Sequence, residues 1–141
     1  MGSPSSLNIN NNKEIIQEMI YFGTYDIGKS YKDKHPFDER VAECKRLKNQ
    51  YPDRIIVILE FDAMLHKHKI KERFLVPEDL TMGQFMFVIR SQLQLTPSEA
   101  VYLMCRGHCI PNTDIFSEIG EKHKEKCGNV FMRLYKENTF G

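Results

Sequence analysis

The sequence lacks several features that define large classes of proteins. Its 141 residues contain no apolar run of the roughly 18 residues that a membrane-spanning helix needs, and its N-terminus has no apolar segment typical of a signal peptide. The formal net charge is only +1, which excludes a strongly basic nucleic-acid-binding protein. A glycine-rich phosphate loop, a nucleophile elbow and a pair of carboxylates in apolar surroundings are also missing. We therefore expect a cytosolic protein that is not an enzyme, has no cofactor and binds no nucleic acid.

Cysteine is sparse, and the four cysteines of a cytosolic protein are expected to be reduced. Two pairs of metal-binding residue types, each four residues apart, leave a structural zinc site open as an alternative. Its ligands would be Cys105, Cys109, His123 and Cys127. We favour the interpretation without metal, because Cys105 ends a predicted strand and can point into the core as a small hydrophobic residue.

The composition is that of one globular domain. With 41% apolar and 28% charged residues, a chain of this length can build one core and hardly two. Residues 1–29 should form a disordered tail, rich in serine and asparagine, and a short amphipathic helix over Lys13–Phe22 that Gly23 ends. Residues 30–136 should form the folded domain with its N-terminal helix, and residues 137–141 a flexible tail.

The densest structural signals lie in residues 73–93. Phe74–Val76 are strand formers, so a strand should end here. Thr81 and Gln84 then have the spacing of a capping box, which predicts a helix over Met82–Leu93. Apolar residues recur within this helix at steps of three and four, so one face must be covered by a sheet.

Hydrophobic periodicity predicts the remaining elements. They are a helix over Phe37–Tyr51, a strand buried on both faces over Arg54–Phe61, an antiparallel return strand over Ile70–Val76, a strand over Val101–Cys105, a short helix within Pro111–Glu121 and a strand over Val130–Tyr135. This order predicts an α+β fold, the ubiquitin-like roll or β-grasp, in which a helix crosses a four-stranded mixed sheet and helices precede it. A fold alone does not name a function.

Several short blocks of sequence spread over residues 30–141 stand out. They are His35-Pro36-Phe37, Tyr51-Pro52-Asp53-Arg54-Ile55, Phe74-Leu75-Val76-Pro77, Asp79-Leu80-Thr81, Gly83-Gln84-Phe85, Val88-Ile89-Arg90 and Glu137-Asn138-Thr139-Phe140-Gly141. Together these blocks resemble the autophagy ubiquitin-like modifiers of the GABARAP and microtubule-associated protein light chain three family. Several blocks in one order are far more specific than any single short motif.

The resemblance implies a modifier that is conjugated through Gly141 to phosphatidylethanolamine on autophagosomal membranes. A glycine at the end of a mobile segment suits this chemistry, because it adds no side chain and little backbone restriction. The implied partners are activating and conjugating enzymes of the ubiquitin-like type, a processing or delipidating cysteine protease, and cargo receptors. Because Gly141 is the last residue of the sequence, we expect a processing protease to have nothing left to remove. A non-conjugated peptide-binding adaptor of the same fold is the alternative.

The resemblance also implies a groove that adds an aromatic-x-x-aliphatic motif to the predicted strand Ile70–Val76 as an extra strand, provided that this strand lies at the sheet edge. The first pocket, for the aromatic residue, would be lined by Glu43, Leu47, Ile56, Ile58, Arg73 and Leu75. The second pocket, for the aliphatic residue, would be lined by Phe74, Val76, Pro77, Leu80, Phe85 and Val88. The apolar members of both sets would also be core residues in any ubiquitin-like roll.

A basic rim should attract acidic residues that flank such motifs, and it would consist of Arg54, Lys67, Lys69, Lys71 and Arg90. Two residues depart from the family pattern in the first pocket: Ile56 stands in place of a proline, and Asn129 in place of an aromatic residue. The predicted N-terminal helix could pack on the body, contact a membrane or cover the binding edge. Because no aromatic-x-x-aliphatic spacing occurs between Tyr21 and Ile27, we do not expect the chain to occupy its own pockets through that motif.

Overall fold

The structure is a computed structural model that describes residues 14, 18–62, 65 and 71–137. The elements in chain order are β1 (Ile20–Thr24), α2 (Tyr31–Lys34), α3 (Phe37–Gln50), β2 (Arg54–Phe61), β3 (Lys71–Pro77), α4 (Met82–Leu93), β4 (Val101–Cys105), β5 (His108–Cys109), α5 (Phe116–His123) and β6 (Val130–Lys136). None of the helices in these ranges combines the length and the apolar character that crossing a bilayer requires.

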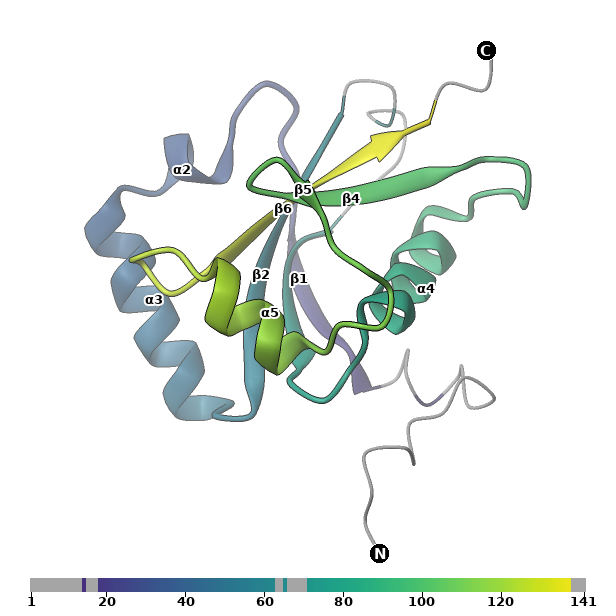
Figure 1. The fold of residues 1–141 in the computed structure, drawn as a ribbon. Helices are drawn as coiled ribbons and strands as arrows, with labels where there is room; N and C mark the ends of the chain where they lie inside the picture. Colours follow the sequence, from purple (N-terminus) through teal and green to yellow (C-terminus); the bar gives the residue numbers. More distant parts are fainter. Residues whose placement is uncertain (1–13, 15–17, 63–64, 66–70, 138–141) are drawn as a thin grey trace, which may run out of the picture.

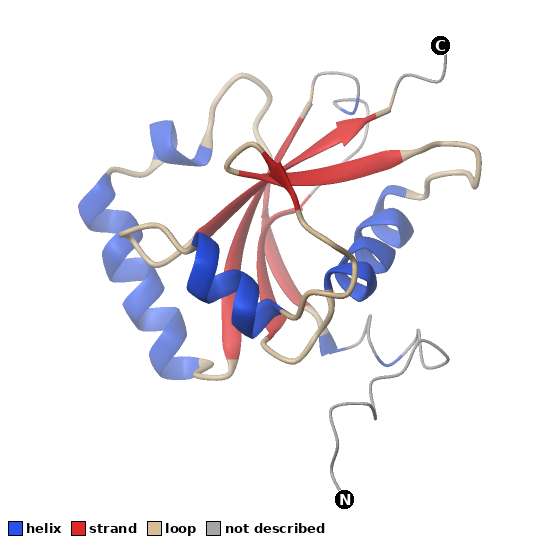
Figure 2. Ribbon diagram, viewed as in Figure 1, coloured by secondary structure: helices blue, strands red, loops and turns tan. Residues whose placement is uncertain are grey.

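One sheet holds all six strands in the order β1-β3-β2-β6-β4-β5 (Figures 1 and 2). The pair β2 and β6 is parallel, and the other pairs are antiparallel. Four of these strands and the crossing helix form the predicted ubiquitin-like roll, which is thereby confirmed. Helix α3 packs on one face of the sheet, and α4 and α5 pack on the other. Residues Val57 to Leu59 of β2 are fully buried, as expected for a central strand covered on both faces.

Helix α4 begins where the capping box predicted. Thr81 Oγ1 accepts a hydrogen bond from the backbone N–H of Gln84 at 3.2 Å, and Gln84 Oε1 accepts one from the backbone N–H of Thr81 at 2.9 Å. These two bonds satisfy backbone donors that the first turn of a helix otherwise leaves unpaired. The apolar stripe of α4 faces the main core, where Phe85 is fully buried.

Replacing the cap should cost measurable stability. We expect Thr81→Ala to lower the free energy of unfolding by about 1 kcal/mol, because a backbone donor of the first turn loses its acceptor. Chemical denaturation followed by circular dichroism measures the loss, and Thr81→Ser, which keeps the hydroxyl, is the matched control. Equal losses for both variants would contradict a role for the hydroxyl.

The N-terminal segment differs from its prediction. Residues Ile20–Phe22, the end of the predicted helix, lie in strand β1, so the helix prediction is wrong for this part. The rest of that helix and the predicted tail lie largely outside the described residues. The physical reason is the pairing with β3, which sends the side chains of Ile20 and Phe22 to the α3 face of the sheet and that of Tyr21 toward Phe74. Gly23 ends this alternation with a backbone φ of 74°.

Candidate functional site

Strand β3 does not lie at the edge of the sheet, which corrects the expectation of an open edge at Ile70–Val76. It is paired with β2 on one side and with β1 on the other. In the antiparallel register of β1 and β3, the opposite residues are Ile20 and Leu75, Tyr21 and Phe74, Phe22 and Arg73, and Thr24 and Lys71. The chain therefore covers its own candidate groove, although it does so with a strand that lacks the aromatic-x-x-aliphatic spacing.

The structure brings three of the four apolar residues of the predicted first pocket together, all except Ile58. Leu47, Ile56 and Leu75 form a buried cluster between α3 and the sheet. The side chains of Ile20 and Phe22 pack against this cluster from β1. The inner part of the first pocket is thus filled by two apolar residues of the chain's own N-terminal segment.

Arg73 marks the outer part of the first pocket. Its guanidinium lies 4.4 Å from the ring centre of Phe22 and 5.8 Å from that of Tyr31, both within the range of cation–π contacts. Burial raises the pKa of the Tyr31 hydroxyl, while the neighbouring Arg73 charge acts in the opposite direction. Ile58 is fully buried. Beside Arg73 an open cavity of about 320 Å³ remains, lined by Tyr31, His35, Glu39, Ala42, Glu43, Arg46 and Arg73.

The predicted second pocket is part of the main core. Five of its members, Phe74, Val76, Leu80, Phe85 and Val88, are at most 1% exposed and belong to the main hydrophobic cluster. Pro77 is also buried and pairs with Arg54 of β2. The interpretation of these residues as packing therefore holds for this structure. On the β1 side, Met19 joins the same cluster, and the Tyr21 ring lies 5.9 Å from the Phe74 ring.

The predicted basic rim is only partly assembled. Arg54 Nη1 donates to the backbone carbonyl of Glu18 at 2.7 Å and to that of Leu75 at 3.1 Å, so it joins the N-terminal segment to β3. Lys71 is exposed at the start of β3. Arg90, by contrast, is used within the fold, because it donates to backbone carbonyls of the loop between α4 and β4. Lys67 and Lys69 lie outside the described residues.

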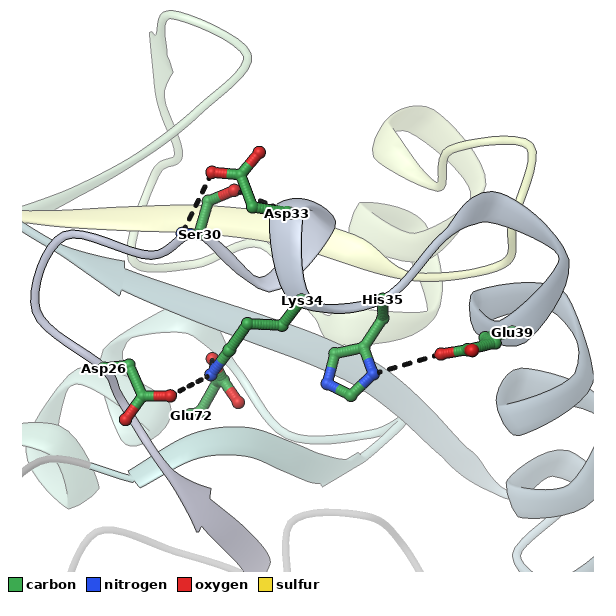
Figure 3. Close-up of polar contacts among 7 residues, drawn as sticks. All are labelled: Asp26, Ser30, Asp33, Lys34, His35, Glu39 and Glu72. Atoms are coloured by element: carbon green, nitrogen blue, oxygen red, sulfur yellow. Dashed lines mark hydrogen bonds and ion pairs between the residues drawn. The ribbon is translucent and has the colours of Figure 1, made fainter.

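Sequence reasoning missed a charged cluster beside the groove, which Figure 3 shows. Lys34 Nζ lies 2.7 Å from Glu72 Oε1 and 3.2 Å from Asp26 Oδ2. Glu72 is only 3% exposed on β3, and Asp26 follows β1 in the chain. Burial alone would lower the pKa of Lys34, but the two carboxylates outweigh it and raise this pKa. The only sequence signal was Glu72 as the single acidic residue within a basic stretch.

Helix α2, which carries Lys34, also has a capping box. Ser30 Oγ accepts from the backbone N–H of Asp33 at 3.0 Å, and Asp33 Oδ2 accepts from the backbone N–H of Ser30 at 3.4 Å (Figure 3). His35 follows α2, and its Nδ1 lies 3.6 Å from Glu39 Oε2. The first two bonds fix the start of α2, and the contact of His35 with Glu39 joins the end of α2 to α3.

Asn129, one of the two departures from the family pattern, lies on the α3 side of the sheet. It is 2% exposed, and its Oδ1 accepts a hydrogen bond from Cys44 Sγ at 2.6 Å. Burial, followed by the nearby Cys127 and Glu43, raises the pKa of the Cys44 thiol to about 12. Cys44 is therefore a protonated donor at neutral pH, and the asparagine serves α3 packing. The other departure, Ile56, belongs to the same apolar cluster as Cys44.

The zinc alternative finds no geometric support in the part of the chain that the structure describes, where no three histidine, cysteine or acidic side chains are placed to hold one metal ion. Cys105 and Cys127 are buried, whereas Cys109 is exposed. Burial raises the pKa of the Cys105 thiol to about 11, as expected for a small core residue rather than a metal-binding thiolate.

Comparisons with known proteins agree with the fold and the sequence blocks. Residues 39–141 match the family model described as "Autophagy protein Atg8 ubiquitin like". The chain is similar to autophagy-related protein 8d of Arabidopsis thaliana, with 40% identity over 113 residues that cover 79% of this chain and 94% of the relative. Autophagy-related protein 8 of Aspergillus niger is 40% identical over 115 residues, covering 79% and 95%. The crystal structure of Trypanosoma brucei ATG8 has a TM-score of 0.69 and 30% identity, and the match covers 83% of this chain and all of that one.

Proposed function

Because the chain belongs to the Atg8 family of ubiquitin-like autophagy proteins, we propose that it acts as a protein modifier conjugated through Gly141 to phosphatidylethanolamine. The observation that carries the proposal is that the family match continues through the tail to Gly141. The modifier would be cytoplasmic before conjugation and attached to autophagosomal membranes after it. A cysteine protease would hydrolyse the lipid amide and so release the protein from the membrane.

The reaction falls on the carboxylate of Gly141, and the catalytic cysteines belong to the partner enzymes. An activating enzyme joins this carboxylate to AMP from ATP and releases pyrophosphate. A cysteine thiolate then displaces AMP to form a thioester, which passes to the cysteine of a conjugating enzyme. Finally the amine of the lipid headgroup attacks the thioester carbonyl, so that an amide forms and the thiol leaves.

The end of the folded body supports this use of the tail. The backbone N–H of Glu137 donates to the carbonyl of Ala100 at 2.8 Å, just beyond the pairing of Lys136 with Val101. Four residues follow up to Gly141, and fully extended they span roughly 13 Å. A tail of this length can enter a narrow enzyme cleft without requiring the sheet to follow.

The test is reconstituted conjugation with activating and conjugating enzymes, ATP and vesicles that contain phosphatidylethanolamine. We expect Gly141→Ala to slow the appearance of the lipidated form by roughly tenfold or more, because a site shaped for glycine must accept an extra methyl group. Gly83→Ala is the matched control, because it makes the same change outside the tail. An added Cβ there would lie 3.4 Å from Asn112, a van der Waals contact that the fold should accept, so conjugation should stay at the parent rate. Equal conjugation of Gly141→Ala and the parent protein contradicts attachment through Gly141, whereas a parent protein that is not lipidated at all favours the non-conjugated adaptor.

The second part of the proposed function is the recruitment of cargo receptors. An aromatic-x-x-aliphatic segment would pair with β3 and place its aromatic side chain beside Leu47, Ile56 and Leu75. This proposal is supported by the apolar cluster and by the neighbouring cations of Arg54 and Lys71, which suit acidic flanking residues. The clear difficulty is that β1 occupies the same position.

A further inference from the structure

We infer that β1 is a resident occupant of the receptor groove, and that a guest strand pairs with β3 only after β1 has left. This inference rests on the proposed docking of receptors at β3. It adds to that function a control step within the chain itself. The first argument is the number of strands that can pair with β3. Because β2 already pairs with one side of β3, a single side remains, and only one strand can pair there.

The side chains of β1, together with Met19 just before it, pack against the residues of both predicted pockets. Ile20 and Phe22 pack on the cluster of the first pocket, and Phe22 also lies under the Arg73 guanidinium. On the opposite face, Met19 is buried with the residues of the second pocket, and Tyr21 contacts the ring of Phe74. A guest aromatic residue and Phe22 would therefore compete for one apolar surface.

The position of β1 at the edge of the sheet distinguishes it from the four strands of the ubiquitin-like roll. It enters the sheet from the N-terminal end and runs antiparallel to β3 at the boundary of the sheet, with no further strand beyond it in the described residues. Its loss would leave β3, β2, β6 and β4, the four strands of the expected roll, paired as before. Departure of β1 is therefore compatible with a folded body.

The connection after β1 is held by charge. Lys34 contacts both Asp26, in this connection, and Glu72, on β3 (Figure 3). On the other side of β1, the carbonyl of Glu18 accepts from Arg54. Each end of β1 is thus joined to the body by a cation, and Arg54 is also a rim residue that would meet the acidic flank of a guest. An acidic guest can compete with Glu18 for this cation as it arrives.

A reversible cross-link between β1 and β3 tests the inference within one molecule. Thr24 and Lys71 are exposed and directly opposite each other. Opposite residues of antiparallel strands have Cα atoms about 4.5–5.5 Å apart, which suits a disulfide. The variant Thr24→Cys with Lys71→Cys would be made together with Cys109→Ser, because Cys109 is the exposed native cysteine.

The probe is a synthetic peptide with acidic residues followed by Trp-x-x-Leu. The protein contains no tryptophan, so the fluorescence of the peptide reports binding directly. We expect the oxidised, locked form to bind at least about tenfold more weakly than the same protein after reduction, because the apparent affinity falls with the open fraction.

A second variant releases β1 instead of locking it. Ile20→Ser with Phe22→Ser removes the two side chains that pack on the first pocket, so we expect the peptide to bind on the order of tenfold more tightly than to the parent. Ile27→Ser is the matched control, since Ile27 is 63% exposed beyond the end of β1, and it should leave affinity unchanged. Without peptide, hydrogen exchange at the β3 amides that face β1 should be faster in the released variant than in the parent or in Ile27→Ser.

The outcomes separate the inference from the function on which it rests. Equal affinity of the locked and reduced forms would overturn the control by β1 while leaving receptor docking in place. If the released variant exchanges its β3 amides rapidly and still binds no peptide, then the docking function itself is wrong, and the control step falls with it. Weaker binding by the released variant would mean that β1 builds the site rather than covering it, which also overturns the inference.

Discussion

Phe85→Ala is expected to lower the free energy of unfolding by about 3–5 kcal/mol, the largest effect of any single change considered for this protein. Phe85 is fully buried at the centre of the main core. The centre of its ring lies 5.5 Å from the ring centre of Phe74 and 5.2 Å from that of Phe116, and both pairs are edge-to-face. Removing the ring leaves a cavity that α4, α5 and β3 all border, so the surroundings can collapse only in part.

Chemical denaturation measures the loss, and Phe37→Ala provides the matched control. Phe37 is the first residue of α3 and is 48% exposed, so the same substitution there should cost well under half as much. A loss below about 1 kcal/mol for Phe85→Ala would contradict the packing of α4 across the sheet.

Lys34→Met is expected to lower the free energy of unfolding by about 3 kcal/mol, because it leaves the buried Glu72 carboxylate without its cation. The matched control is Lys32→Met. Lys32 contacts Glu125 at 2.8 Å, but both side chains are substantially exposed, so the loss should stay below about 1 kcal/mol. Equal losses for the two variants would show that burial of Glu72 does not set the cost.

The double variant Lys34→Met with Glu72→Met should recover most of the loss, since no unpaired buried charge then remains and Asp26, the other partner of Lys34, is exposed. The pH dependence has a defined sign. Because the pKa of Lys34 is raised above its usual 10.5, its stabilising contribution is complete below pH 10.5 and is lost as the pH rises through the raised value. On the alkaline side, the difference in stability between the parent and Lys34→Met should therefore persist until the solution is strongly alkaline, which denaturation at a series of pH values can follow.

The elements that local patterns specify strongly were predictable from the sequence. Helix α4 agrees with its prediction at both ends, because Thr81 and Gln84 set its start and its apolar stripe sets its length. Strand β2 also has its predicted bounds, since its continuous run is rich in β-branched residues, which favour a strand covered on both faces. The first pocket followed from the resemblance, and Leu47, Ile56 and Leu75 do meet.

Features that depend on long-range pairing were not predictable. The consecutive apolar residues of Ile20–Phe22 fit a helix or a strand equally well, and only the free side of β3 selects the strand. Arg90 was assigned to the rim, but nearby carbonyls of its own loop capture the guanidinium. The contact between Lys34 and Glu72 joins segments that the chain order keeps apart. Lys34 therefore carried no local signal, and Glu72 stood out only as the one acidic residue in a basic stretch.

Strand β1 also has a consequence for solubility. It is only five residues long and ends at Thr24, directly after Gly23, so it gives the sheet a short border with little surface for other chains to pair with. Strand β3, which β1 covers, is seven residues long and largely apolar, and it would become that border whenever β1 detached. Detachment of β1 would therefore expose a strand on which another molecule could pair. Aggregation is avoided only if β1 returns quickly or a guest strand takes its place.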